Sequence, residues 1–186
     1  QREIEEVVLG DLAQRGLRFK AEVQFPLEID AVGLGDLGRK EAYLARQLNR
    51  WSKQWVASKT HEIPAMEACQ TLLSERMPDQ IGASIVHGDF RLGNMIVDGP
   101  RVLAILDWEL CTLGDPLADV GYLLNNWVSA DEVELLGEGD QSPTAAGGFG
   151  SRESLCDIYA NRTGRDLSNI NYYSTSCIGT FTNTYT

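Results

Sequence analysis

The chain has 186 residues, of which 43% are hydrophobic and 23% charged, and its formal net charge at pH 7 is -11. This length suits one domain that can bury a core of its own, and the composition is that of a globular rather than a disordered protein. The acidic excess repels phosphate backbones and anionic lipid surfaces, so we expect neither a nucleic acid nor a membrane as partner.

The sequence also bears on the cellular compartment. No apolar run reaches the length of a signal-peptide core or of a membrane span. The cysteines are far apart and have neither the paired spacing nor the neighbouring histidines of a zinc site; they are Cys69, Cys111, Cys156 and Cys177. We therefore expect a reducing, cytoplasmic location.

Residues 1–29 predict a helix followed by a strand. Residues 1–16 place apolar side chains roughly on one side of a helix, which Gly16 can end in a left-handed conformation. From Leu17 to Ile29, apolar residues alternate with the two-residue period of a half-buried strand, which Pro26 interrupts. We expect an edge strand or a bent pair of strands here.

Two helices are predicted next. Over residues 37–58, apolar positions recur at three- and four-residue steps. We interpret Trp51 and Trp55 as core residues of this helix rather than as an aromatic platform for a ligand. A second helix is predicted from Ile63 to about Arg76, because Pro64 suits a first helical position.

Short β-branched runs between Ser84 and Leu106 predict strands. The turn sequence of residues 98–101 joins the last two runs into an antiparallel hairpin. In this hairpin, residues whose numbers sum to about 200 lie opposite one another. Asn94 is therefore expected to face Leu106 and Asp107 at the open end of the hairpin.

The last third of the chain predicts two more helices. One begins after Asp115, which can act as its N-cap, and the other spans residues 151–163 and is ended by Gly164. Residues 137–150 are rich in glycine but lack the spacing of a phosphate-binding loop, so we interpret them as a flexible surface connection. The polar residues 174–186 are expected to have little regular structure.

Three polar side chains are expected to converge at the hairpin, namely Asp89, Asn94 and Asp107. Mg²⁺ accepts carboxylate and amide oxygens together with waters and substrate phosphates, so Asn94 and Asp107 form a candidate metal site. In kinases, an aspartate five residues before the metal-binding asparagine orients the attacking hydroxyl and accepts its proton. Asp89 and Asn94 have this separation, and His87 lies two residues before the aspartate.

The segment from Ile85 to Asn94 resembles the catalytic loop of the aminoglycoside phosphotransferase and choline kinase family, with residues 106–109 in place of the protein-kinase DFG region. Further stretches are similar to the phosphotransferase domains related to acyl-CoA dehydrogenase family members; they are residues 36–39, 50–55, 63–66 and 113–122. The resemblance implies an α+β fold over residues 30–173, namely the large lobe of a kinase-like enzyme, mostly helical with a small catalytic β-hairpin. Residues 174–186 would follow as a polar tail.

The resemblance also implies a reaction. ATP and Mg²⁺ would serve as cofactors, and a small hydroxylated molecule would accept the γ-phosphoryl group. Asp89 is the implied catalytic base, and Asn94 and Asp107 are the implied ligands of the nucleotide-bound metal. Arg91 would contact the transferring phosphoryl group.

Supporting roles are expected around this centre. His87 is expected to pack and hydrogen-bond so that it holds the loop, and Asp119 to anchor the loop from behind. Glu109 faces either the metal or a polar substrate, or forms an outward salt bridge. A zinc hydrolase built on His87 and Asp89 is a weaker alternative, because His61 is the other histidine of the chain and zinc sites usually have more nitrogen or sulfur ligands.

Two parts of a kinase-like enzyme are not recognised in residues 1–29: a glycine-rich loop over the phosphates and a strand lysine that pairs with them. We therefore expect the small nucleotide lobe to be largely missing. The alternatives are a fragment, a truncated gene, or a pseudokinase-like module that binds metal, nucleotide or a partner without turnover. The segment 17–29 would cover the apolar cleft in its own chain, or exchange with that of a neighbour in a homodimer.

The sequence leaves two classes of acceptor molecule open. The acidic balance of the chain favours a cationic acceptor such as an aminosugar or choline. The closer resemblance favours a hydroxylated acyl compound.

Overall fold

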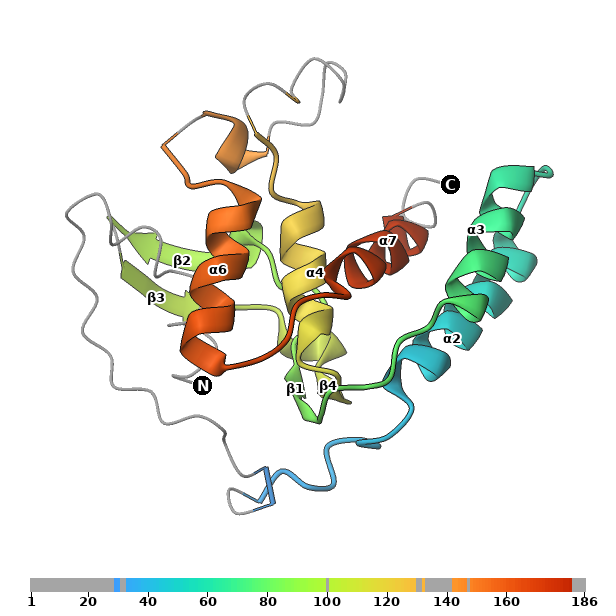
Figure 1. The fold of residues 1–186 in the computed structure, drawn as a ribbon, viewed down its shortest axis with the longest axis horizontal. Coiled ribbons are helices and arrows are strands. Elements are labelled where there is room, and N and C mark those ends of the chain that lie inside the picture. The colour runs from blue at the N-terminus through green and yellow to red at the C-terminus, as the bar shows by residue number, and fades with distance from the viewer. Residues whose placement is uncertain are drawn as a thin grey trace.

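The computed structural model describes residues 29–30, 33–99, 101–129, 132, 142–146 and 148–181, with side chains as far as residue 176. Helices form most of the regular structure, and two small antiparallel sheets lie beside them (Figure 1). The predicted α+β class is therefore confirmed. In chain order the elements are α2 (Tyr43–Ser58), α3 (Pro64–Glu75), β1 (Ser84–Val86), the 3-10 turn η2 (Leu92–Asn94), β2 (Met95–Asp98), β3 (Arg101–Ile105), η3 (Trp108–Leu110), β4 (Thr112–Gly114), α4 (Leu117–Asn125), η4 (Pro143–Ala146), α6 (Arg152–Thr163) and α7 (Ile170–Phe181).

The N-terminal predictions fall largely outside this part of the chain. The helix predicted over residues 1–16 lies outside the described residues, as does nearly all of the strand predicted over 17–29. Ile29, the last residue of that strand, is buried and belongs to a turn in which its carbonyl accepts a hydrogen bond from the Leu34 amide.

The hairpin has the predicted register. Met95 pairs with Ile105 and Ile96 with Ala104, after which an irregularity shifts the pairing by one residue. The second sheet pairs β1 with β4 and was not predicted, since β4 is only three residues long. This pairing brings the loop that follows β1 beside the segment that connects the hairpin to β4.

Helix α2 begins at Tyr43, six residues after the predicted start at residue 37. Tertiary contacts explain the later start. A Cβ on Gly38 would lie 2.4 Å from the Thr112 hydroxyl oxygen, so this stretch runs closely against β4. The side-chain oxygen of Gln80 then accepts the Tyr43 amide at 3.0 Å, at the first turn of the helix.

The tryptophans of α2 and the predicted start of α3 fit the sequence analysis. Trp55 is buried, whereas Trp51 is half-buried with the Arg50 guanidinium 5.0 Å from its ring centre. The core interpretation therefore holds fully for Trp55 and partly for Trp51. Pro64 occupies the first turn of α3, as its fixed φ allows.

The expectation of little structure after residue 173 is wrong as far as Phe181, because α7 continues through this stretch. Helix α7 packs closely on α4, where a Cβ on Gly121 would lie 2.5 Å from the Cβ of Tyr173. The glycine thus permits an approach that buries the Tyr173 ring. Before α4, Asp115 accepts the Leu117 amide at 2.9 Å, although Pro116 rather than the predicted Asp115 occupies the N-cap position.

The other C-terminal elements agree with their sequence signals. Ser151 caps α6 by accepting the Ser154 amide, and Gly164 ends the helix with a φ of 66°. Part of the predicted flexible connection over 137–150 is anchored instead. The buried hydroxyl of Thr144 accepts the Val128 amide at 2.8 Å and donates to the Val128 carbonyl at 2.9 Å.

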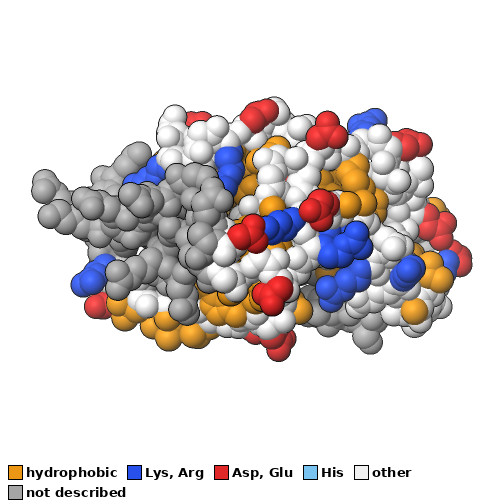
Figure 2. All heavy atoms as spheres, turned by 90° about the horizontal axis from the view of Figure 1, so that it is seen from below, with side chains coloured by type: hydrophobic (Ala, Val, Ile, Leu, Met, Phe, Trp, Pro, Cys, Tyr) orange, Lys and Arg blue, Asp and Glu red, His pale blue; other side chains and the backbone are white. Residues whose placement is uncertain are grey.

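The surface carries both charge signs together with apolar patches. On the face shown in Figure 2, acidic and basic side chains lie between patches of hydrophobic side chains. The β2–β3 hairpin contributes exposed apolar residues that include Ile96, Val97 and Leu103. Among the described residues, no helix has both the length and the apolar character needed to cross a membrane.

Candidate functional site

The loop between β1 and η2 is attached to α4 by one carboxylate. Asp119 accepts the amide of His87 at 2.7 Å through Oδ2 and the amide of Gly88 at 3.0 Å through Oδ1. Burial raises the pKa of Asp119, while the two backbone donors oppose this rise by stabilising the charged form. The carboxylate thereby fixes the backbone of the two residues that precede Asp89.

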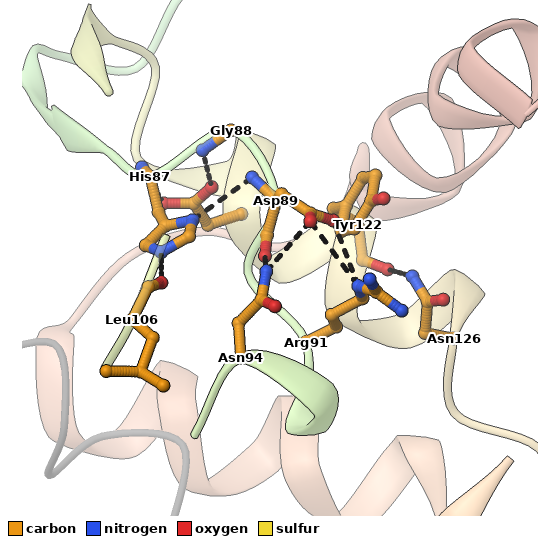
Figure 3. Close-up of polar contacts among 9 residues, drawn as sticks. His87, Gly88, Asp89, Arg91, Asn94, Leu106, Tyr122 and Asn126 are labelled. Carbon is orange, nitrogen blue, oxygen red and sulfur yellow. Dashed lines mark hydrogen bonds and ion pairs between the residues drawn. The ribbon is translucent and has the colours of Figure 1, made fainter. Parts of the chain in front are cut away.

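His87 connects the same loop to the end of the hairpin (Figure 3). Its Nδ1 accepts the Asp89 amide at 3.1 Å, and its Nε2 lies 2.8 Å from the Leu106 carbonyl oxygen. An amide can only donate and a carbonyl can only accept, so the imidazole is neutral with its proton on Nε2. The ring is fully buried and packs against Trp108, with ring centres 4.7 Å apart.

This arrangement removes the zinc alternative. Both nitrogens of His87 are engaged within the protein, so the ring has no free lone pair for a metal. Over the described residues, no group of three or more His, Cys, Asp and Glu side chains is placed to hold a metal ion. A site made of one amide and one carboxylate oxygen does not depend on such a group.

Asp89, Arg91 and Asn94 are in direct contact. The Asn94 side-chain amide donates to Asp89 Oδ2 and to the Asp89 carbonyl, both at 2.8 Å. Arg91 Nε donates to Asp89 Oδ2 at 3.4 Å and lies 3.2 Å from Oδ1. The buried Oδ1 has no hydrogen-bond partner among the described residues. The carboxylate is therefore oriented through Oδ2, while Oδ1 keeps its hydrogen-bonding capacity.

Asp107 lies at the open end of the hairpin. The Leu106 amide donates to the Asn94 carbonyl at 2.8 Å, so Asp107 is the next residue beyond this pair. Its side chain is exposed, and its backbone is left-handed, with φ 66° and ψ 52°. Aspartate tolerates this conformation better than most residues, and such backbone strain is frequent at functional sites.

A cavity of about 410 Å³ opens beside the loop. Gly88 and residues 109–112 line one part of it, and residues of α2, α3, α4 and α7 line the rest. Glu109 is exposed and forms no ion pair with any described residue, so the outward salt bridge is not observed. Sequence reasoning missed this cavity because the apolar spacing of its helices is the same as that of a filled core.

Known proteins are similar to this chain in sequence and in fold. The phosphotransferase enzyme family model matches residues 8–153. Acyl-CoA dehydrogenase family member 10 of Mus musculus is 42% identical over 124 residues, which are 65% of this chain and 12% of that protein. Family member 11 of the same species is 36% identical over 152 residues, which are 79% of this chain and 19% of that protein. The chain thus spans a small part of these relatives.

A solved structure agrees with these sequence matches. A protein from Ralstonia eutropha, described as a candidate aminoglycoside phosphotransferase, superposes with a TM-score of 0.71 at 31% identity. The superposition covers 95% of this chain and 54% of that chain. The loop, the hairpin and the helices around them thus occur together in a kinase-like phosphotransferase fold, and the chain belongs to the phosphotransferase enzyme family.

Proposed function

We propose that this chain carries the catalytic part of an ATP-dependent small-molecule O-phosphotransferase. In this proposal, residues 30–173 form the large lobe of the kinase-like fold, and the γ-phosphoryl group of ATP moves to a hydroxyl of the acceptor. Membership of the phosphotransferase enzyme family supports the reaction class. The observation that carries the proposal is the orientation of Asp89 by Asn94, while the other carboxylate oxygen accepts no hydrogen bond from any described residue.

Asp89 is the proposed base. Asn94 and Arg91 donate to its Oδ2, and Asn94 and His87 hold its backbone carbonyl and amide, so both the carboxylate and the backbone of Asp89 are held in place. The buried Oδ1 has no hydrogen-bond partner within the described part of the chain. A substrate hydroxyl that donates to Oδ1 would satisfy this acceptor and would be aligned for attack.

Mg²⁺ fits the proposed ligands. Asn94 uses its side-chain nitrogen for Asp89, and no hydrogen bond within the described part of the chain engages its side-chain oxygen. Asp107 has an exposed carboxylate and directly follows Leu106, whose amide donates to the Asn94 carbonyl. These are hard oxygen donors, as Mg²⁺ requires, and the bound ion would neutralise charge on the phosphate oxygens.

The proposed reaction is a single displacement. The acceptor oxygen forms a bond to the γ-phosphorus as the bond from that phosphorus to the β,γ-bridging oxygen breaks, and ADP leaves. The hydroxyl proton passes to Asp89 Oδ1. Arg91, whose side chain is about half exposed and 3.2 Å from the same carboxylate, would turn toward the negative charge of the transferring group.

The test combines turnover with nucleotide binding. We expect Mg²⁺-dependent ATP consumption with at least one member of a panel of hydroxylated metabolites. The Asp89→Asn variant should bind the nucleotide but lose about 10²- to 10⁴-fold in rate, because it cannot accept the proton. Asp107→Ala should lose Mg²⁺-dependent nucleotide binding in calorimetry, whereas Asp98→Ala, an exposed control at the hairpin turn, should not.

Two outcomes would refute this reaction. Nucleotide binding without turnover of any alcohol in the panel would indicate a binding module rather than an enzyme. Unchanged turnover in Asp89→Asn would show that another group accepts the proton.

A further inference from the structure

Asp107 has a backbone conformation that its own side chain does not explain. Among the described residues, Ala42 and Asp107 are the non-glycine residues with a positive φ. Aspartate adopts the left-handed region most readily where its side chain hydrogen-bonds the local backbone. Asp107 occupies the N-cap position of η3, yet its exposed side chain makes no capping hydrogen bond. Its neighbours therefore impose the conformation, and the carboxylate stays available to a ligand.

The residue before Asp107 is held at both of its backbone polar groups. The Leu106 amide donates to the Asn94 carbonyl at 2.8 Å, and the Leu106 carbonyl oxygen lies 2.8 Å from His87 Nε2. The second of these bonds acts on the peptide group that joins Leu106 to Asp107. The chain is therefore fixed where it enters Asp107.

Trp108 holds the chain on the other side of Asp107. Its indole N–H donates to the Ile105 carbonyl at 2.9 Å, so this bond spans Asp107 and ties the residue after it to the end of β3. The Trp108 carbonyl accepts the Cys111 amide at 3.0 Å within η3. Loss of the indole donor would free the chain where it leaves Asp107.

The Trp108 ring makes a separate contact. It packs against the buried imidazole of His87, with ring centres 4.7 Å apart and an angle of 54° between the ring planes. A phenylalanine at this position can keep an aromatic contact with His87 but has no N–H group for Ile105. The substitution Trp108→Phe therefore separates the hydrogen bond from the ring contact.

We propose that Trp108 is a positioning residue whose indole N–H holds Asp107 in the left-handed conformation in which its carboxylate binds the nucleotide-bound Mg²⁺. Without this bond, Asp107 spends part of the time in other backbone conformations, and metal binding has to restore the left-handed one. The apparent affinity for the metal then falls. This proposal rests on the phosphotransferase function proposed above, since it takes Asp107 to be a metal ligand.

Trp108→Phe in the full chain tests the role of the indole N–H. NMR backbone chemical shifts report φ and ψ of Asp107, and calorimetry measures the binding of ADP with Mg²⁺ or with EDTA. We expect the shifts of Asp107 to move out of the left-handed range in the variant. The Kd for ADP with Mg²⁺ should rise about fivefold, as the loss of one hydrogen bond allows. The Kd for ADP with EDTA should not change, because the metal-free nucleotide does not use Asp107.

Trp127→Phe is the matched control. The Trp127 indole also donates to a backbone carbonyl at 2.9 Å, that of Gly150, and its ring packs against Phe149 with ring centres 5.5 Å apart. The control thus removes an equivalent bond from a tryptophan that does not flank a proposed metal ligand. We expect it to leave the shifts of Asp107 and both affinities for ADP as in the wild type. A general loss of stability would affect both variants, whereas a loss of positioning affects Trp108→Phe alone.

A measurement on the unmodified chain covers the case in which Trp108→Phe does not fold. Coupling between two equilibria is reciprocal, so ADP with Mg²⁺ should slow hydrogen exchange at the Trp108 indole about fivefold. ADP with EDTA should not slow it, and the Trp127 indole should exchange at the same rate in both samples.

The outcomes separate the positioning from the reaction. Left-handed shifts of Asp107 that persist in Trp108→Phe would overturn the role of Trp108, as would an equal loss of affinity in both tryptophan variants. Exchange at the Trp108 indole that ignores bound ADP and Mg²⁺ would also overturn it. An unmodified chain that binds no ADP with Mg²⁺ would refute the proposed function, and a change of the Asp107 shifts in Trp108→Phe alone would still support the hold of Trp108 on Asp107.

Discussion

Replacement of Gly121 by alanine should destabilise the protein, although the same change usually stabilises a helix. In α4, alanine is favoured over glycine by about 1 kcal/mol from helix propensity. The added Cβ would lie 2.5 Å from the Cβ of Tyr173, 2.8 Å from its carbonyl carbon and 2.9 Å from the Ser174 amide nitrogen. Two of these atoms belong to the α7 backbone, so no flexible side chain can move aside.

The magnitude follows from the required movement. Carbon atoms pack at about 3.5 to 4.0 Å, so α7 has to move by about 1 Å from α4 or the helices have to distort. Overpacking typically costs about 1 to 3 kcal/mol, and the upper value applies here because backbone atoms have to move. After the gain in helix propensity, we expect Gly121→Ala to lower the free energy of unfolding by about 2 kcal/mol, which corresponds to a fall in Tm of about 4 to 8 °C.

Urea denaturation and thermal melts followed by circular dichroism measure this difference. Gly93→Ala is the matched control, because a Cβ there would approach nothing more closely than the flexible Arg91 guanidinium at 3.5 Å. We expect the control to remain within about 0.5 kcal/mol of the wild type. A Gly121→Ala variant as stable as the wild type, or more stable, would refute the close packing of the two helices.

Three further predictions concern hydrogen bonds and pH. Asp119→Ala removes the acceptor of two amides, so hydrogen exchange at His87 and Gly88 should accelerate; unchanged exchange would contradict the attachment of the loop to α4. His87→Gln should accelerate hydrogen exchange at the Asp89 amide, because His87 Nδ1 is the acceptor of that amide. Protection of the Asp89 amide equal to that in the wild type would exclude this role of His87. The Arg152 guanidinium hydrogen-bonds Glu132 and holds its pKa at about 2, below the usual 4.5. The stability from this pair is present above pH 4.5 and is lost as the pH falls toward 2, so wild type and Glu132→Gln should converge in urea titrations over that range. Because the pair is about one-third exposed, the difference should be at most about 1 kcal/mol, and a gap independent of pH would exclude the ion pair.

Elements with local signals could be predicted from the sequence. Ser151 and Gly164 bracket α6 because a cap hydroxyl and a left-handed glycine act within one helical turn. The hairpin register followed from the turn for the same reason. The start of α2 and the length of α7 depend instead on contacts between distant segments. Neither the close passage of Gly38 along β4 nor that of Tyr173 along α4 has a local signal.

The candidate site also combines features with a local sequence signal and features that depend on the folded environment. The spacing of Asp89 and Asn94 and the antiparallel pairing were sufficient to expect these side chains together, and they are in hydrogen-bond contact. The left-handed backbone of Asp107 and the tautomer of His87 arise from the folded environment. The cavity is lined by four helices that are distant in the sequence, so its outline exists only at the tertiary level.

These contacts couple the loop to the rest of the fold. Helix α4 carries Asp119, which holds the loop backbone, and two residues later Gly121, which sets the distance to α7. Helix α7 also forms a wall of the cavity through Tyr172 and Tyr173. A displacement of α7 therefore changes the cavity beside the loop directly and the position of Asp89 through α4. Helix α7, which continues into the segment expected to be a polar tail from residue 174, thus helps to position the proposed base and to form the cavity beside it.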